Sequence, residues 1–347
     1  MNAIVDSPLA ARWQQFKQDN PKVRIRDAAK QLGASEAELV ALGLGDTATR
    51  LEGDFRELLK EVGSLGYVMA LTRNDEVVHE RKGVYEDISF NGHVGLVLGE
   101  DIDLRLFMYA WKHAFAVQEN DRFSLQFFDG SGTAVHKIYL TDKSITVAYW
   151  DLVKKYRAAD QESLPETTAY PAIEAELEDS LIDAEAFQQD WLALQDTHAF
   201  FGMLKKHKVS RLQGLRLAPA DHAIKLEWAQ FRGICESAAT QGIPIMVFVG
   251  NRGCIQIHTG PVKRLVDMGP WFNVLDPEFN LHLREDAVAQ IWITRKPTSD
   301  GIVTGIEVFN AEGEQIALFF GKRKPGIPED LAWRSLVDQA TLVVEQK

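Results

Sequence analysis

The segment Leu104-Arg105-Leu106 returns about 177 residues later as Leu281-His282-Leu283, and both belong to a longer internal repeat. At nearly the same shift, the turn Phe128-Asp129-Gly130-Ser131-Gly132 aligns with Phe309-Asn310-Ala311-Glu312-Gly313. The matched positions are mostly apolar or turn residues, which a duplicated core must keep. The central residues of the first pair, an arginine and a histidine, have diverged. The sequence therefore predicts one domain present twice, with a single site built from both copies.

The composition is that of a globular protein with two domains of ordinary size. The chain has 347 residues, of which 46% are hydrophobic and 25% charged. The sequence shows neither a secretion signal nor the roughly 20 apolar residues of a membrane helix, which predicts a cytoplasmic protein without membrane insertion. A net charge of -12 makes nucleic acid an unlikely partner. Cys235 and Cys254 lack metal-ligand spacing, so we interpret them as thiols in a reducing compartment.

Each copy places helices before strands, which predicts an α+β fold: a tandem repeat in which each half is a large antiparallel sheet with flanking helices. In the first copy we predict helices at 10–18, 25–32, 35–42 and 54–64, and strands at 67–72, 76–79, 94–98, 102–107, 113–118, 123–128 and 134–140. In the second, helices occupy 183–239 and strands 243–320. The predicted parts are a first repeat (8–145), an acidic linker (146–182), a second repeat (183–326) and a helical tail (327–347).

His198 is the strongest candidate for chemistry. On a predicted helix spanning 183–207 it lies in the middle of an apolar stripe, which consists of Phe187, Trp191, Leu194, His198, Phe201 and Leu204. Spacing alone favours a core histidine bonded to a backbone carbonyl. The functional alternative is an imidazole presented from an apolar wall to a large apolar ligand such as a metalloporphyrin, for which one neutral nitrogen suffices as axial ligand.

Basic residues form the second group of candidates. Arg105 shares a strand face with Asp103, and a surface ion pair would explain it, but the histidine at its repeat position argues for a more specific role. In the second copy the lysines and arginines cluster, and either a solvated face or a pocket rim that pairs with two carboxylates would explain them. The cluster comprises Lys205, Lys206, Lys208, Arg211, Lys296, Lys322, Arg323 and Lys324.

Several other chemistries find no support. The histidines lack the HxxxH or HExxH spacing of a zinc site, and there is no CxxCH segment for covalent haem. Walker, Rossmann and GxSxG patterns are missing from the sequence as well. The segment Val23–Leu39 scans like a helix-turn-helix, but its second helix begins Ser35-Glu36-Ala37-Glu38 and would repel phosphates. A helical hairpin packed beside a sheet is the favoured interpretation.

The chain resembles the HemS/ChuS/HmuS family of cytoplasmic hemin-transport and hemin-degrading proteins of Gram-negative bacteria. The resemblance covers nearly the whole chain. It rests on the segments Arg26-Asp27-Ala28-Ala29, Met69-Ala70-Leu71-Thr72-Arg73-Asn74, Asp103-Leu104-Arg105-Leu106-Phe107, Trp111-Lys112-His113-Ala114-Phe115-Ala116-Val117, Leu125-Gln126-Phe127-Phe128-Asp129, Asp196-Thr197-His198-Ala199-Phe200-Phe201 and Gly250-Asn251-Arg252-Gly253-Cys254-Ile255-Gln256-Ile257-His258.

The resemblance implies a site for one b-type haem (hemin) in a cleft of the second repeat, against residues of the first. It implies that His198 is the proximal ligand of the haem iron and that Arg105 lies on the distal side, where it would be catalytic if the protein is an enzyme. The remaining implied contacts are a porphyrin-packing ring and cations for the propionates, namely Phe248, Arg211, Lys296 and Arg323.

The implied function is that of a cytoplasmic haem-binding protein of bacterial haem-iron uptake, which traffics haem, degrades it to release iron, or does both. A dedicated haem oxygenase-like enzyme is the alternative. It would need an external reductant, because the sequence has no flavin or nicotinamide motif. A helix-turn-helix regulator is a distant third. The expected partners are haem, a haem importer as donor and a haem oxygenase as acceptor, with the protein a monomer or homodimer.

Overall fold

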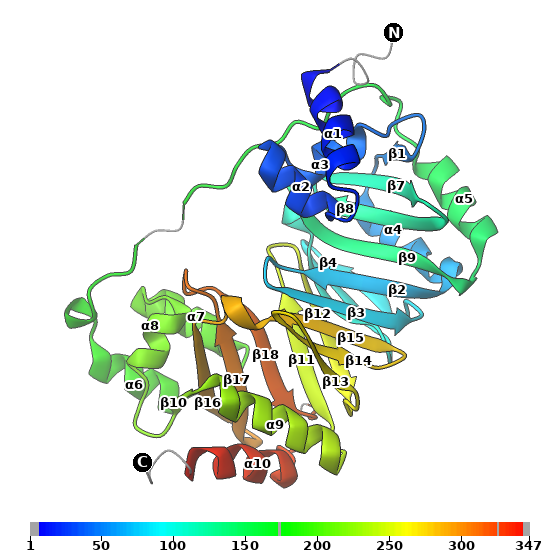
Figure 1. The fold of residues 1–347 in the computed structure, drawn as a ribbon. Coiled ribbons are helices and arrows are strands. Elements are labelled where there is room, and N and C mark those ends of the chain that lie inside the picture. The colour runs from blue at the N-terminus through cyan, green and yellow to red at the C-terminus, as the bar shows by residue number, and fades with distance from the viewer. Residues whose placement is uncertain (1–6, 173–174, 325, 343–347) are drawn as a thin grey trace. The chain divides into compact units, whose positions relative to one another are not determined.

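The computed structural model describes residues 7–172, 175–324 and 326–342 (Figure 1). These residues form two compact units. The first unit comprises Met1–Arg73, Glu80–Pro171 and Gly250–Gln256, and the second comprises Asn74–His79, Ala172–Val249 and Ile257–Lys347, in each case as far as the chain is described. Two strands, β3 (Val77–Gly83) and β12 (Cys254–Gly260), begin in one unit and end in the other. Of the predicted parts, residues 173–174 of the linker and 343–347 of the tail lie outside the described residues.

The first unit begins with helices and continues with antiparallel strands. Its helices are α1 (Pro8–Asp19), α2 (Ile25–Leu32), α3 (Glu36–Ala41), α4 (Phe55–Glu61) and α5 (Thr146–Tyr156), with short 3-10 turns η1 (Val62–Leu65) and η2 (Met108–Ala110). Its strands are β1 (Ala48–Leu51), β2 (Gly66–Arg73), β4 (Ile88–Asn91), β5 (Val94–Leu98), β6 (Asp103–Phe107), β7 (His113–Glu119), β8 (Arg122–Phe128) and β9 (Ala134–Ser144). They pair in the orders β1-β7-β8-β9-β2 and β4-β5-β6.

The second unit repeats this plan. Its helices are α6 (Ala184–Leu192), α7 (Ala199–His207), α8 (Arg211–Arg216), α9 (Trp228–Gln241) and α10 (Leu331–Leu342), with turns η3 (Asp179–Leu181) and η4 (Glu285–Ala287). Its strands are β10 (Ala223–Leu226), β11 (Ile245–Gly250), β13 (Leu265–Met268), β14 (Trp271–Leu275), β15 (Phe279–Arg284), β16 (Gln290–Thr298), β17 (Gly301–Phe309) and β18 (Gln315–Gly321). They pair in the orders β10-β16-β17-β18-β11 and β13-β14-β15.

The duplication is visible in the strand registers. In the first unit Arg50 pairs with Phe115 across β1 and β7, and in the second Lys225 pairs with Trp292 across β10 and β16. Within the described residues the strands form two nine-stranded antiparallel sheets with flanking helices. The predicted α+β tandem repeat is therefore confirmed.

Alternation along the strands decides which face of the second unit's sheet is covered. Ile291 and Ile293 of β16 are buried in the core that Phe231 of α9 and Trp333 of α10 also enter. The residues that alternate with them, Trp292 and Thr294, point to the opposite face, because successive side chains of a strand alternate. That opposite face carries the candidate site.

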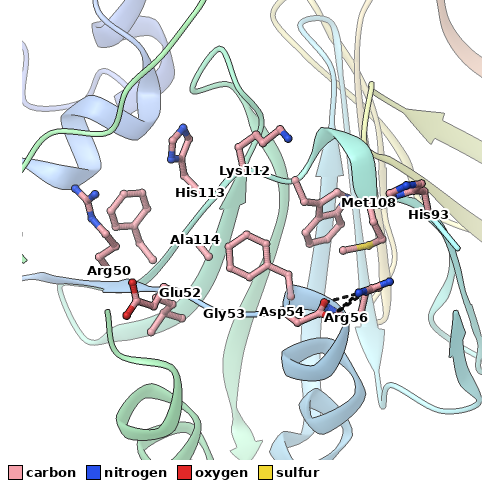
Figure 2. A pocket seen from close by; sticks show the side chains of 14 residues that line it. Arg50, Glu52, Gly53, Asp54, Arg56, His93, Met108, Lys112, His113 and Ala114 are labelled. Carbon is pink, nitrogen blue, oxygen red and sulfur yellow. Dashed lines mark hydrogen bonds and ion pairs between the residues drawn. The ribbon is translucent and has the colours of Figure 1, made fainter. Parts of the chain in front are cut away.

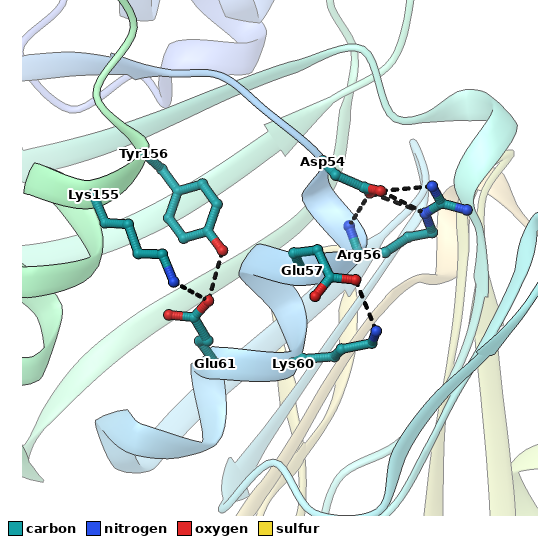
Figure 3. Close-up of polar contacts among 7 residues, drawn as sticks. All are labelled: Asp54, Arg56, Glu57, Lys60, Glu61, Lys155 and Tyr156. Carbon is teal, nitrogen blue, oxygen red and sulfur yellow. Dashed lines mark hydrogen bonds and ion pairs between the residues drawn. The ribbon is translucent and has the colours of Figure 1, made fainter.

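The predicted acidic linker begins with a helix. Tyr149, Leu152 and Val153 of α5 are buried in the core of the first unit, and Glu61 of α4 accepts hydrogen bonds from Lys155 (2.6 Å) and Tyr156 (2.7 Å), as Figure 3 shows. These apolar positions recur at helical spacing, which gives the segment a face to bury.

The chain beyond α5 is extended and bonded to the first unit. The backbone N–H of Ala158 donates to the carbonyl of Arg50 (2.9 Å), and that of Thr168 donates to the carbonyl of Gly130 (2.8 Å).

None of the helices in the described part of the chain combines the length and apolar character of a membrane span.

The helix-turn-helix-like segment packs against the first sheet. It forms α2 and α3, and the Ser35 hydroxyl accepts from the backbone N–H of Glu38 (3.2 Å) in a capping box. Glu36, at the start of the would-be recognition helix, is buried and bonded to the ammonium of Lys137 (2.5 Å). The segment is thus a helical hairpin packed beside a sheet, which is the interpretation that its acidic residues favoured over DNA binding.

Candidate functional site

The structure places His198 between two helices. The prediction of one helix over 183–207 is wrong, because α6 ends at Leu192 and α7 begins at Ala199. The Asp196 carboxylate accepts from the backbone N–H of His198 (2.9 Å), and the carbonyl of Gln195 accepts from the N–H of Ser299 (2.9 Å). These bonds replace the helical ladder, as side chains of aspartate often do. The predicted position of His198 within an apolar stripe is therefore also wrong: it is the N-cap residue of α7.

The imidazole of His198 is solvent-accessible and held by one carboxylate. Its side chain is 85% exposed, and Nδ1 lies 2.7 Å from Oδ1 of Asp196. In the neutral ring, Nδ1–H donates to Asp196 and Nε2 keeps its lone pair. The backbone N–H of His198, together with its side chain, lowers the pKa of Asp196, so the carboxylate stays charged and fixes the ring. A histidine arranged in this way can ligate a metal through Nε2.

The face of the sheet opposite α9 and α10 carries aromatic side chains at both ends. At one end Trp292 of β16 packs with Phe187 and Trp191 of α6. At the other end Phe248 of β11 and Phe320 of β18 are half-buried, with ring centroids 5.5 Å apart and an interplanar angle of 82°. Half-buried aromatic rings of this kind suit a large flat ligand.

The absence of a side chain at Gly305 lets the ring of Phe320 lie close to the backbone of β17. A Cβ at Gly305 of β17 would stand 2.6 Å from a ring carbon of Phe320, which lies directly across from Gly305 in the β17–β18 register. Any larger residue would push the ring out of its place. Gly305 therefore fixes the position of Phe320 on the open face.

Two predicted cations meet at a buried carboxylate on the same face. Arg211, the first residue of α8, binds Glu307 through Nε (2.5 Å) and Nη2 (3.1 Å), and the Lys296 ammonium lies 2.5 Å from the same carboxylate. Lys296 is only 2% exposed and its Nζ lies 4.2 Å from the ring centroid of Phe200. Lys296 is thus a buried member of an Arg211–Glu307–Lys296 cluster, with Arg211 the more accessible of its two cations.

The charges within this cluster determine its protonation. Burial alone would raise the pKa of Glu307, but Arg211 and Lys296 together lower it to about 2. Burial lowers the pKa of Lys296 to about 8 despite the carboxylate. At neutral pH Glu307 is therefore ionised, and the paired Lys296 remains mainly protonated.

Arg323, which follows β18, lies near the His198 segment. Its charge lowers the pKa of Asp196, and its Nη2 is 3.9 Å from Asp300 at the β16–β17 turn. Its Nε is buried without a hydrogen-bond partner among the described residues. The structure thus brings Arg323 close to Asp196, the carboxylate that orients His198.

Arg105 belongs to the first unit and lies on β6. The alternation of that strand buries Leu104 and Leu106 and leaves Asp103 and Arg105 half-buried on the other face, where they form an ion pair. Burial raises the pKa of Asp103, although Arg105 opposes the shift. At the repeat position, Nδ1 of His282 lies 2.6 Å from Oδ1 of Asn273. The distal role of Arg105 stays a prediction.

Sequence reasoning missed three residues that shape the site. Asp196 could have been found from its position two residues before the histidine, where an Asx turn is common. Glu307 had a weaker signal, an acid within the otherwise apolar strand Gly301–Phe309. Phe320 had none, because its exposure depends on the register of β17 and β18.

These features define a class of protein: a repeated α+β fold that can bind a large, flat, partly apolar ligand bearing anionic groups and a metal. Among the described residues there is no cluster of three or more His, Cys, Asp or Glu that could hold a metal.

The particular family follows from comparison with known proteins. The chain belongs to the family of the haemin-degrading HemS.ChuX domain, whose model matches residues 33–156 and 208–340. It is 40% identical over 328 residues to the hemin transport protein HemS of Yersinia enterocolitica, covering 93% of this chain and 94% of the relative.

Two solved structures share the fold over nearly the full length. The holo form of PhuS, a heme-binding protein from Pseudomonas aeruginosa, is 48% identical with a TM-score of 0.93, covering 95% of this chain and 97% of that one. The heme degrading enzyme ChuS of Escherichia coli O157:H7 is 39% identical with a TM-score of 0.88, covering 95% and 98%.

Proposed function

We propose that this protein binds one haem through Nε2 of His198 and either passes the haem on or degrades it. The observation that carries the proposal is the exposed imidazole whose Nδ1 is 2.7 Å from Asp196, which leaves Nε2 as a free lone pair. A carboxylate behind a ligating histidine orients the ring and raises its basicity. The relatives, named for hemin transport, heme binding and heme degradation, support haem as the ligand.

The surroundings of His198 suit the rest of the haem molecule. Phe248 lies on the half-buried aromatic face and would pack on the porphyrin. Arg211 and Arg323 present guanidinium groups suited to bidentate pairing with propionates. Lys296 is paired with Glu307, which also binds Arg211. Through this shared carboxylate Lys296 would hold Arg211 in place. In its predicted role it would also add positive charge beneath a propionate.

Two versions of the function remain open to experiment. In the carrier version, the protein takes haem from an importer and delivers it to a haem oxygenase in the cytoplasm, as a monomer or homodimer. In the enzymatic version, which the name of the ChuS relative supports, Arg105 stabilises negative charge that develops on the distal side. Haem supplies the oxygen-activating iron when bound, and the electrons come from an external reductant.

A hemin titration followed by absorbance tests the proposal. We expect a one-to-one complex in the natural protein. His198→Ala should weaken hemin binding at least about tenfold and move the Soret band, because another ligand must replace the imidazole. His222→Ala is the matched control, since the imidazole of this histidine in the same unit bonds a local carbonyl, that of Ala220 (2.8 Å). An unchanged spectrum and affinity in His198→Ala would overturn the assignment.

Reductant added in air, with catalase present, then separates the two versions. A stable Soret band indicates a carrier. Loss of the band with a defined tetrapyrrole product and released iron indicates an enzyme. Catalase is needed because free peroxide destroys haem without any enzyme.

A further inference from the structure

The carboxylate of Asp196 contacts His198 twice through one oxygen. Its Oδ1 accepts from the backbone N–H of His198 (2.9 Å) and lies 2.7 Å from Nδ1 of the ring. A hydrogen bond whose acceptor is ionised is roughly twice as strong as one between neutral groups. The carboxylate therefore places a negative charge directly behind the imidazole, in addition to orienting it.

The turn that carries both residues is held in place by its flanks. Leu194 before the turn and Phe200 after it are buried in one apolar core, where the rings of Phe200 and Trp191 pack edge to face with centroids 4.8 Å apart. At the start of α7 the backbone N–H of Ala199 donates to the carbonyl of Asp196 (3.1 Å). The contact between the two exposed side chains therefore rests on a fixed backbone.

The negative charge of Asp196 is largely uncompensated. Among the described residues, no lysine or arginine forms an ion pair with it, and its bonded partner is the imidazole of His198. Arg323 lies nearby, but its Nη2 is 3.9 Å from Asp300, which offsets part of the arginine's charge. The charge of Asp196 is therefore available to act on a metal bound at the other ring nitrogen.

Other histidines of the chain lack this combination. His93 and His113 line a pocket of about 540 Å³ in the first unit, and in the described part of the chain neither ring bonds a carboxylate (Figure 2). His207 bonds Asp190 through Nε2 (2.6 Å), but its side chain is only 10% exposed. His198 combines an exposed ring, a carboxylate at Nδ1 and an available Nε2.

A negative charge behind a ligating imidazole acts differently on the two oxidation states of iron. The ferric form carries one more unit of positive charge than the ferrous form, so it gains more from the carboxylate and from the more basic imidazole. A porphyrin at Nε2 would displace water from the ring, and the effect of a charge grows as water leaves. Both effects favour the ferric form.

We propose that the Asp196 carboxylate makes this site prefer ferric over ferrous haem. The proposal rests on the proposed binding of haem through His198 and adds the oxidation state of the ligand. Such a preference leaves bound haem oxidised until a sufficiently strong reductant reaches it. This property suits a carrier, and it also suits an enzyme that depends on an external reductant.

Spectroelectrochemical titration of the hemin complex tests the proposal, together with anaerobic absorbance titrations of ferric hemin and of dithionite-reduced haem. Asp196→Asn is the informative variant, because asparagine keeps an acceptor oxygen and removes the charge. We expect this variant to weaken ferric binding about tenfold more than ferrous binding. For a one-electron couple, a tenfold change in this ratio raises the reduction potential by about 59 mV.

Asp190→Asn is the matched control. Asp190 also belongs to a carboxylate–histidine pair of the second unit, so this variant makes the same change of charge at a histidine that is not predicted to bind haem. It should leave the reduction potential and both affinities as they are in the natural protein.

The outcomes separate this proposal from the proposed function. If the hemin complex forms and His198→Ala moves its Soret band, but Asp196→Asn leaves the potential unchanged or lowers it, the ferric preference is wrong and haem binding stands. An equal rise in Asp190→Asn would also overturn the preference, because it would reflect the net charge of the protein. If the natural protein does not bind hemin, or if His198→Ala changes neither spectrum nor affinity, both proposals fail.

Discussion

Replacing Glu307 by glutamine should destabilise the second unit by about 3 kcal/mol. The carboxylate is fully buried and accepts from Arg211, Lys296, Thr294 (3.3 Å) and Gln315 (2.7 Å). Glutamine removes the charge and leaves two cations without a partner, a change that costs about 3–5 kcal/mol in buried pairs. Deprotonation of Lys296, whose pKa falls further without the carboxylate, keeps the loss near the lower end.

Linkage gives the same magnitude and predicts a pH dependence. The pKa of Glu307 is about 2 in the folded protein, against an ordinary value of about 4.3 in the unfolded chain. A depressed carboxyl pKa stabilises the fold above the unfolded value, by about 3 kcal/mol for a difference of roughly two units, and this stabilisation is lost as the pH falls through the folded value. The difference between natural protein and variant should therefore be full at pH 7 and shrink between about pH 4.3 and 2.

Urea unfolding followed by tryptophan fluorescence at several pH values measures this difference. The double variant Lys296→Met/Glu307→Gln is the control, since it removes one of the stranded cations and should recover part of the loss. A Glu307→Gln protein whose free energy of unfolding at pH 7 lies within about 0.5 kcal/mol of the natural value would show that the cluster is not a buried ion pair. A loss that stays constant down to pH 2 would refute the linkage argument.

Three further predictions concern haem. Asp196→Asn should weaken hemin affinity about 10- to 100-fold in an absorbance titration, because the ring of His198 loses its orienting carboxylate, and an unchanged affinity would remove Asp196 from the site. Arg105→Ala should leave hemin affinity mostly intact but alter the rate at which bound haem reacts with oxygen or peroxide; an unaltered rate would contradict the distal role. Phe248→Ala should weaken hemin binding about tenfold through lost aromatic contact, and equal affinity would show that the porphyrin lies elsewhere.

Much of the fold could be predicted because its strands alternate strongly and its helices carry local signals. The capping box of Ser35 and Glu38 is an example, since both partners lie within one turn. The strands β1, β4 and β10 are not predicted, because four residues are too few to show an alternating pattern. The helix α5 is not predicted, because its residues were interpreted as the start of the acidic linker.

The site could be predicted in identity but not in geometry. The resemblance points to His198, yet the apolar spacing wrongly predicts that it lies inside a helix. The spacing does not show that the Asp196 carboxylate accepts from the backbone N–H of His198. Lys296 is predicted at a pocket rim, but in the structure it is buried against Glu307. The sequence does not show this contact, because Glu307 meets Lys296 only through the pairing of β16 with β17. Contacts that depend on strand register cannot be predicted from hydrophobic periodicity, because periodicity describes one segment and register joins two.

The two cysteines give each unit its own reporter of opening. Cys254 belongs to the first unit and Cys235 to the second, and they are the only cysteines of the chain. Both are buried, and burial raises the pKa of each thiol to about 12. Because only an exposed thiolate reacts quickly, alkylation of each cysteine proceeds through transient opening of the structure around it. Mass spectrometry of the two labelled peptides therefore measures the opening free energies of the two units side by side, in one sample, with and without haem.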